Sequence, residues 1–398
     1  VLRIANTSDL TRFENELDIA IQRLENAEKA LALATNDGDA QAIAYAKEAV
    51  ENASKEVLTS LENNYESLSE IEQFLAENES KNSESTNAKV AEMLAAQANL
   101  ENNKPQSALV SRYSNTALSE MSANVNVALQ IARNLDRHLL SQDNSNVWAN
   151  TESTKQNYHS DFYRPYKQSL TMTQIGVANN VNDNVRVGAV LSHSRANNTF
   201  AENVSGKNRL TALSTYVKGN WNNGVFASLD LGYGRSRNTI DFDGKNNVFH
   251  RSLFSAGVNA GIQWDWGVNI QPSIGVRYNR LSKANYHLAE AKVESKALNL
   301  MTYRAGLALS KTFDVAGVKL TPSLASYYND ATQRKMAVNG ALSVNNIGMQ
   351  QQFGRYFNHE AGLAAQFNQW QVSAQVGMLK GSDITTQKYA AFKLGYTW

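Results

Sequence analysis

The side chains best suited to proton transfer are spread thinly along this chain. A histidine beside a serine or a carboxylate would make a nucleophilic or hydrolytic site. No spacing in the sequence demands such a pairing, and a lone strand histidine is more often structural. We interpret the six histidines as residues of a helix, of strands or of loops: His138, His159, His193, His250, His287 and His359.

Acid and sulfur chemistry are equally unsupported. Glu360 and Asp230 are the carboxylates that most suggest an acid pair, but they stand on segments that are remote in order. The absence of cysteine removes disulfides, thiolate metal sites and a cysteine nucleophile, and no phosphate-binding P-loop is present. We therefore expect no catalytic, cofactor-binding or metal site. We also expect no nucleic-acid site, because the basic residues are not clustered with aromatic residues in one patch.

The composition excludes one kind of membrane protein and permits another. The 398 residues are 42% hydrophobic, with a mean hydropathy of −0.44, and no apolar run approaches the ~20 residues of a membrane helix. If the chain crosses a membrane, it does so with strands. The 16 Tyr and 22 Gly against only 4 Pro suit long sheet segments.

Charge divides the chain into two parts. Residues 1–103 hold 20 acidic and 8 basic side chains, whereas the rest holds 17 acidic and 30 basic, which indicates separate units. We predict an acidic helical hairpin followed by a linker over 1–104, as a stalk or as the end of a longer N-terminal portion. The start, Val1-Leu2-Arg3-Ile4-Ala5, lacks the features of a signal peptide, so we expect the chain to be the C-terminal part of something longer.

The last eleven residues alternate with a period of two. An apolar side opposite a polar or small side is typical of a strand with lipid outside and a wet lumen inside, and the terminal Trp suits an interfacial aromatic belt. A soluble barrel or a sandwich edge strand is the alternative. The apolar side carries Ala390, Phe392, Leu394, Tyr396 and Trp398.

Similar alternation predicts twelve antiparallel strands. The clearest runs reach about 10 to 16 residues, against ~5 to 6 for soluble strands and ~9 to 11 for strands that cross a bilayer. Connections after even-numbered strands are short, whereas 238–248 and 330–349 are long and polar, as in an outer-membrane barrel whose short turns are periplasmic. The predicted strands are 146–157, 167–179, 184–197, 208–221, 224–237, 249–264, 267–282, 295–313, 317–329, 350–367, 370–380 and 386–398.

A helix is predicted immediately before the first strand, over 107–140. It would be about 50 Å long at ~1.5 Å per residue, enough to cross a ~30 Å hydrocarbon layer, but it is too polar to face lipid. An even strand count places both ends of the barrel on the short-turn rim, so the helix runs back through the bore. The predicted fold is an all-β transmembrane barrel of 12 antiparallel strands over 143–398, with a lumen helix over 105–142 and the acidic helical segment in front.

Charged residues that face the lumen need partners or water. We expect the helix to contact the barrel wall through Glu120, Arg133, Asp136 and Arg137, and the sequence leaves open which wall charge each one meets. The charged wall residues that we expect to face the lumen are Arg186, Asp230, Arg277, Arg304, Glu360 and Lys393.

Several motifs resemble one family of secreted proteins. The chain carries SRYSNTALSE at 111–120, LDRH at 135–138, NVW at 146–148, SDFYRPY at 160–166, TQIGV at 173–177 and GYTW at its end. Together these are similar to the translocator unit of the immunoglobulin A protease and Hap group of monomeric autotransporters, over about 105–398. The resemblance implies type V secretion, in which a barrel in the Gram-negative outer membrane delivers an N-terminal passenger to the cell surface.

The same resemblance implies partners and an assembly signal. It implies recognition by the barrel-assembly machinery and periplasmic chaperones, and it carries the assembly signal over to Phe392, Leu394, Tyr396 and Trp398. It also implies a serine-protease passenger, which this chain does not contain, since it has no Gly-Asp-Ser-Gly run. We therefore expect the chain itself to be no enzyme.

Passenger release and two other functional classes bear on this interpretation. Some autotransporters cut their linker inside the pore between adjacent Asn residues, but the Asn pair here, Asn102-Asn103, precedes the predicted helix. We expect cleavage above the membrane, if the passenger is released at all.

A porin would leave the bore open, and a twelve-stranded outer-membrane lipase would need a Ser–His pair on its outer wall. We expect a monomer surrounded by outer-membrane lipid.

Overall fold

The computed structural model describes residues 7–63, 112–159, 163–289, 291–331, 335–342, 345–352, 354–382 and 384–398. The Asn102-Asn103 pair, the predicted linker after Asn63 and the start of the predicted lumen helix lie outside these residues. None of the described helices has a stretch that is both long and apolar enough to cross a membrane.

The acidic segment forms the predicted helical hairpin. Helix α1 (Thr7–Asp37) and helix α2 (Ala40–Asn63) pack side by side through small and branched residues such as Leu17 and Val57. Gly38 turns the chain between them with a φ of 71°, a left-handed conformation that favours glycine. Asp39 then caps α2, because its Oδ1 accepts a hydrogen bond from the backbone N of Gln41 at 2.9 Å.

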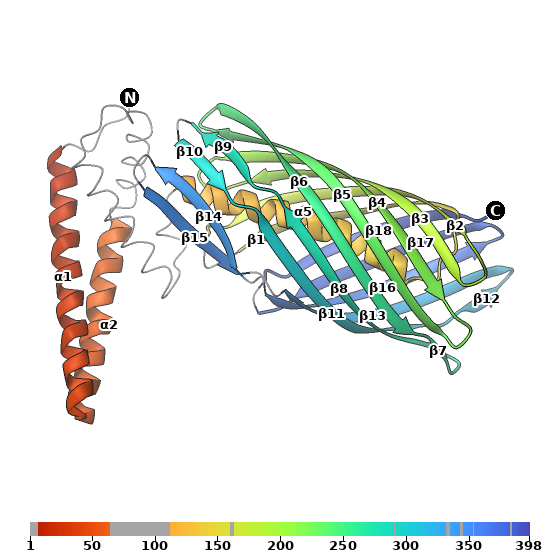
Figure 1. Ribbon diagram of the computed structural model, residues 1–398, viewed down its shortest axis with the longest axis horizontal. Helices are drawn as coiled ribbons and strands as arrows, with labels where there is room; N and C mark the ends of the chain where they lie inside the picture. The colour runs from red at the N-terminus through yellow and green to blue at the C-terminus, as the bar shows by residue number, and fades with distance from the viewer. Residues whose placement is uncertain are drawn as a thin grey trace.

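Twelve long antiparallel strands form a closed barrel, which confirms the predicted fold class (Figure 1). Each barrel strand pairs with the next one in sequence, and the last strand returns to pair with the first, with Phe392 opposite Thr151. The barrel strands are β1 (Val147–Tyr158), β2 (Tyr166–Asn180), β3 (Val185–Thr199), β4 (Ser205–Asn220), β5 (Val225–Phe242), β6 (Lys245–Ile262), β8 (Asn269–Leu281), β11 (Leu298–Ser310), β13 (Val318–Ala331), β16 (Arg355–Phe367), β17 (Trp370–Lys380) and β18 (Gln387–Tyr396). Two short strands, β7 (Trp264–Asp265) and β12 (Phe313–Val315), lie at the turns.

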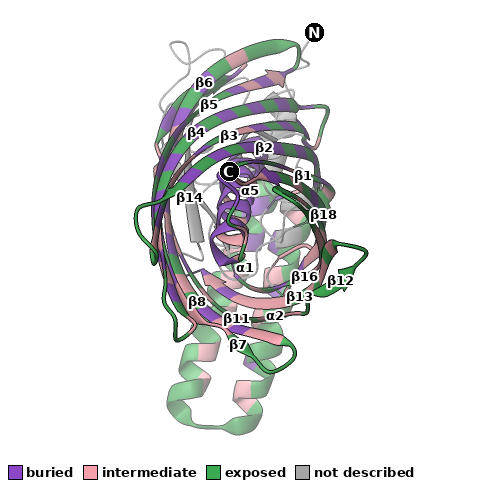
Figure 2. Ribbon diagram, turned by 90° about the vertical axis from the view of Figure 1, so that its right-hand side faces the viewer, coloured by how far each residue is buried: buried purple, intermediate pink, exposed green. Residues whose placement is uncertain are grey.

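The pleat of the strands separates an apolar outer wall from a polar lumen. In β5, Leu229, Leu231 and Tyr233 are 46%, 50% and 59% exposed on the outside, whereas Asp230 between them is 1% exposed. Figure 2 shows this alternation as bands of buried and exposed residues along neighbouring strands. Large apolar side chains that point away from the centre suit a hydrocarbon surrounding.

Helix α5 (Arg112–Leu140) runs inside the barrel, as Figures 1 and 2 show. From Asn115 to Leu140 its side chains are buried or half-buried, and the buried ones include polar residues such as Thr116, Ser119 and Asn134. Towards the end with the long connections, Leu118 and Met121 join one apolar cluster with wall residues that include Tyr166. The helix is therefore packed against the wall as part of the core of the barrel.

One predicted loop is wrong. Instead of a loop over 238–248, β5 continues to Phe242 and β6 begins at Lys245. Asp243 and Gly244 form the turn between them, with left-handed φ values of 54° and 76°. The polar residues of this stretch suggested a loop, but Ile240 and Phe242 alternate with them and are buried in the core.

The long connections also build a second sheet. Strands β9 (Ala284–Leu288), β10 (Ala291–Ser295), β14 (Lys335–Leu342) and β15 (Asn345–Gln352) pair in the order β15-β14-β10-β9. The predicted loop 330–349 is thus largely a hairpin. The tenth barrel strand starts at Arg355 rather than at residue 350, because residues before it belong to β15.

Candidate functional site

Ion pairs attach α5 to the barrel wall along its length. We call this set the lumen network. It contains the four helix residues that the sequence singled out, together with wall residues from six strands. Its members are Glu120, Arg133, Asp136 and Arg137 of α5, and Glu152, Asp230, Arg251, Arg277, Arg304 and Glu360 of the wall.

At the end towards the long connections, Glu120 meets Arg251 of β6. Arg251 Nη2 donates to Glu120 Oε2 at 2.7 Å, and both side chains are almost fully buried. The Tyr286 hydroxyl donates to the same oxygen at 3.4 Å, and Asn124 Nδ2 donates to Oε1. Arg251 also donates to Ser295 Oγ at 3.1 Å, so the pair links α5 to the wall and to strand β10.

In the middle of the bore, Asp136 lies between two arginines. Arg277 Nη2 donates to Asp136 Oδ1 at 2.7 Å, and Arg304 Nη1 lies 3.4 Å from Oδ2. Arg277 also holds Asp230 through two parallel hydrogen bonds of 2.8 Å. Asn259 donates to Asp136 at 3.0 Å. Two carboxylates and two guanidinium groups therefore neutralise one another inside the bore.

On another side of the helix, the arginines belong to α5 and the carboxylates belong to the wall. Arg137 Nη2 donates to Glu360 Oε2 at 2.8 Å and to Glu152 Oε2 at 3.3 Å, and Arg133 also donates to Glu152. The Tyr389 hydroxyl donates to Glu360 Oε2 at 2.5 Å, and the Arg133 guanidinium lies 4.4 Å from the centre of the Tyr389 ring. A cation–π contact thus adds to the ion pairs on this side.

The end of α5 is held by wall side chains that bind its free carbonyl groups. The last carbonyls of a helix have no partner inside the helix. Here Gln271 Nε2 donates to Leu140 O at 2.8 Å, and Lys218 Nζ donates to Ser141 O at 2.7 Å. Arg186, predicted to face the lumen, donates to Asn144 O at 2.8 Å and binds the next carbonyl as well.

Lys393 joins the last strand to the segment between α5 and β1. Its Nζ lies 2.7 Å from Asp143 Oδ2 and 2.6 Å from His138 Nδ1. Burial opposes ionisation of Asp143, but the nearby Lys393 ammonium and hydrogen bonds from Ser145 outweigh it and lower the pKa of this carboxyl. The His138 ring stacks on Trp148 with its centre 4.1 Å away.

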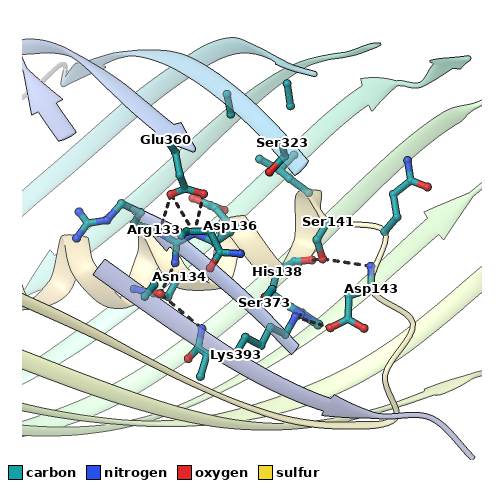
Figure 3. A pocket seen from close by; sticks show the side chains of 18 of the residues that line it. Arg133, Asn134, Asp136, His138, Ser141, Asp143, Ser323, Glu360, Ser373 and Lys393 are labelled. Atoms are coloured by element: carbon teal, nitrogen blue, oxygen red, sulfur yellow. Dashed lines mark hydrogen bonds and ion pairs between the residues drawn. The ribbon is translucent and has the colours of Figure 1, made fainter. Parts of the chain in front are cut away.

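The helix does not fill the bore evenly. A cavity of about 720 Å³ lies between the C-terminal half of α5 and the wall made by β8, β11, β13, β16, β17 and β18. Its lining includes Gln366 and Gln371 at the short-turn rim and Ser323 deeper in the wall. Figure 3 shows Arg133, Asp136 and Glu360 around this space. Towards the other end, the described residues enclose a smaller pocket of about 70 Å³, lined in part by Tyr356 and Leu379.

The suggested acid pair does not exist. Asp230 is bound to Arg277, and Glu360 is bound to Arg137, so each carboxylate has an arginine partner instead of the other acid. Among the described residues, no group of three or more His, Asp and Glu side chains is arranged to hold a metal ion.

A Ser–His contact does occur on the outer wall, although the sequence spacing gave no sign of it. Ser326 Oγ lies 2.9 Å from His359 Nδ1, because β13 and β16 place the two residues directly opposite each other. A hydrolytic pair also needs a group that orients the imidazole. Within the described part of the chain, the other interaction of His359 is ring stacking on Phe357. The contact therefore lacks the third member of a triad.

The sequence missed four charged residues of the site, and one of them is Lys218. Arg251 lies on the same side of its strand as Asn259, so extending the alternation of β6 would have found it. Glu152 lies on β1, whose outer face is made of small and polar residues and gave no clear sidedness. Asp143 lies in a connection, where no periodicity applies.

The four predicted assembly-signal residues lie where the alternation placed them. Phe392, Leu394 and Trp398 are exposed on the outer wall, and Tyr396 packs edge-on against Trp370 with ring centres 4.9 Å apart. The regular strand ends at Tyr396, and the backbone N of Trp398 donates to Asn146 Oδ1 at 2.9 Å.

Residues 147–377 match the model of the autotransporter beta-domain. The chain is 36% identical over 295 residues to an adhesion and penetration protein autotransporter of Haemophilus influenzae, which covers 74% of this chain and 20% of that protein. It is 30% identical over 326 residues to an immunoglobulin A1 protease autotransporter of Haemophilus influenzae. This match covers 78% of this chain and 17% of that protein. The chain thus spans about a fifth of the length of these relatives.

The fold has a solved counterpart. The translocator domain of the autotransporter NalP from Neisseria meningitidis superposes with a TM-score of 0.54, at 16% identity, over 70% of this chain and 98% of that one. The barrel is accordingly a type V secretion translocator of the Gram-negative outer membrane. By the match over most of its barrel, this chain belongs to the autotransporter beta-domain family.

Proposed function

We propose that this translocator anchors a passenger joined to the N-terminal side of α5, and that α5 then remains in the bore as a plug. The lumen network carries this proposal, since all four of its helix residues form ion pairs with oppositely charged residues of the wall. A segment that only passed through the bore would have no need of partners buried at fixed positions.

The proposal divides the chain into three working parts. Residues 1–104 are the stalk or the last part of the passenger, 105–142 are the lumen helix with its flanks, and 143–398 are the barrel. The helical hairpin of α1 and α2 suits a spacer, because its charged faces are solvated and its small apolar seam is covered by its own partner helix.

The passenger is proposed to be a serine protease of the cell surface. The matched relatives include an immunoglobulin A1 protease autotransporter and an autotransporter named for adhesion and penetration, and the chain covers only about a fifth of their length. The barrel-assembly machinery and periplasmic chaperones are proposed partners on the route to the membrane. Release of the passenger is proposed to occur outside the barrel, by a protease that is not this chain.

Conductance tests the plug. Deleting Arg112–Leu140 removes the helix and its four residues of the lumen network, and we expect single-channel conductance in planar bilayers to rise from near closed to that of an open twelve-stranded pore. Deleting residues 7–63 removes the helical hairpin of α1 and α2, which lies outside the barrel, and we expect no change in conductance. An unchanged conductance after loss of α5, in a barrel that still shows heat-shifted migration on gels, would refute the plug.

Surface delivery tests the translocator with its passenger. A reporter domain fused before residue 1, with a secretory signal peptide in front of it, should be digested by protease added to intact cells expressing the fusion. A fusion that lacks the barrel should remain protected. Protection of the reporter in both cases would contradict delivery.

A further inference from the structure

The outer wall carries a row of arginines that the lumen network does not use. Arg195 of β3, Arg209 of β4 and Arg237 of β5 lie directly opposite one another across neighbouring strands, and His250 of β6 continues the row. Arg235 lies on the same outer face of β5, two residues before Arg237. We call Arg195, Arg209, Arg235 and Arg237 the arginine row.

No carboxylate of the described residues forms an ion pair with an arginine of the arginine row. All four side chains are exposed, and within the described residues their one polar contact joins Arg195 Nε to His193 Nε2 at 3.4 Å. Arg355, elsewhere on the barrel, lies 3.6 Å from Asp330. Like charges directly opposite each other across strands destabilise a sheet. A row of this kind is therefore expected to have a counter-anion from outside the chain.

The position of the row on the barrel indicates which class of anion it binds. On β5 the outward residues from Val225 to Tyr233 are apolar or small, and the next outward residue is Arg235. This run of nine residues matches the ~9 to 11 that cross a bilayer. On β4 the outward residues change from apolar to charged within four positions, from Leu213 to Arg209. The row thus borders the apolar band at the end of the barrel with the long connections, which is the extracellular end.

We propose that the arginine row binds the phosphate groups of the glycolipid in the outer leaflet, the bisphosphorylated lipid A portion of lipopolysaccharide. One guanidinium group can donate two parallel hydrogen bonds to the oxygens of a phosphate. Neighbouring strands lie ~4.8 Å apart, so several guanidinium groups can contact one lipid headgroup. A soluble polyanion would not use the apolar surface directly below, where Leu231 and Tyr233 are exposed. A lipid with phosphates and several acyl chains contacts both surfaces together.

A matched pair of variants tests the proposal. The full chain, purified in a zwitterionic detergent, is titrated with bisphosphorylated lipid A, and binding is followed through the rise of its unfolding temperature. We expect Arg209→Gln with Arg237→Gln to weaken the apparent affinity by about tenfold. The control is Lys380→Gln with Lys388→Gln, which removes two exposed cations from β17 and the start of β18. We expect this control to bind as the unaltered chain does.

Dephosphorylated lipid A separates the phosphates from the acyl chains. It should bind the unaltered chain about as weakly as bisphosphorylated lipid A binds the arginine variant. Equal binding of both lipids, or equal losses in the two variants, would overturn the proposal in favour of acyl burial or of unspecific surface charge. All the substituted side chains point outwards, and heat-shifted migration on gels verifies that each variant is folded. The surface-delivery test is independent of this outcome.

Discussion

At the scale of single residues, the bore depends on exact charge balance between two surfaces. The lumen network pairs five carboxylates with five arginines. In a buried network, removing one partner leaves an uncompensated charge, which costs more than the pair itself contributes. The largest losses of stability are therefore expected where the partner that remains is buried. Arg251 is the clearest case, because its side chain is 0% exposed and its partner Glu120 is almost fully buried.

We expect Arg251→Met to lower the free energy of unfolding by about 3–5 kcal/mol, because it strands the Glu120 carboxylate in the core. Arg355→Met is the matched control. Its ion pair with Asp330 is half exposed, so we expect a loss within about 1 kcal/mol. Denaturant unfolding of both variants in the same lipid vesicles measures the difference. Adding Glu120→Gln to Arg251→Met should recover part of the loss, and equal losses in the two single variants would contradict a buried charge pair.

Acid should loosen the connection between α5 and β1. The folded pKa of Asp143 lies below its ordinary value of about 3.9, so its ionised form stabilises the fold above that pH, and this contribution is lost as pH falls through the folded pKa. We expect Asp143→Asn to be less stable than the unaltered chain near neutral pH and to approach it in acid. Unfolding midpoints from pH 7 to pH 2 test this, with the exposed Asp314→Asn as control. A gap that stays constant down to pH 2 would rule out the Lys393 ion pair as its source.

At the scale of elements, period-two alternation made the barrel predictable. A strand between lipid and a polar lumen must alternate, so the twelve strands and the orientation of the last one follow from residues such as Phe392 and Lys393. The predicted loop over 238–248 failed because β5 and β6 continue past the lipid, where the outer face becomes polar and the inward Ile240 and Phe242 carry the only signal. The sequence could not pair Glu120 with Arg251, because partners 131 residues apart are set by helix depth and rotation in the bore.

The last strand offers a test of assembly apart from stability. Phe392 is 50% exposed to the outside, so Phe392→Ala removes little packing within the barrel. If the barrel-assembly machinery binds this strand, we expect the variant to reach the outer membrane in several-fold lower amount in cells, while folding into detergent micelles normally. Phe367→Ala on β16 is the matched control, since Phe367 is 57% exposed. Equal accumulation of the two variants would argue against Phe392 as part of the signal.

At the scale of the whole molecule, the described residues pack closely around the first half of α5 and leave a large cavity beside its second half. Contacts near Glu120 close the bore towards the long connections, where β9 and β10 add a second layer. The cavity of about 720 Å³ lies beside the other half of α5 and reaches the short-turn rim. Solvent from the periplasm should therefore enter about half of the barrel while the outer half stays closed. This asymmetry lets a plugged barrel tolerate the charged residues on the cavity side, because water can hydrate them.

Two lumen-facing serines on different walls make this asymmetry measurable, and the chain has no cysteine to interfere. Ser323 of β13 lines the cavity, whereas Ser194 of β3 is 0% exposed. In oriented membranes, we expect Ser323→Cys to react with a charged, impermeant thiol reagent added at the periplasmic side many times faster than Ser194→Cys does. The same reagent added at the outer side should label both slowly, since the bore narrows at Tyr356 and Leu379. Deleting Arg112–Leu140 should make both positions reactive from either side. If Ser194→Cys reacts as fast as Ser323→Cys while the helix is present, α5 does not pack against β3 as a seal requires.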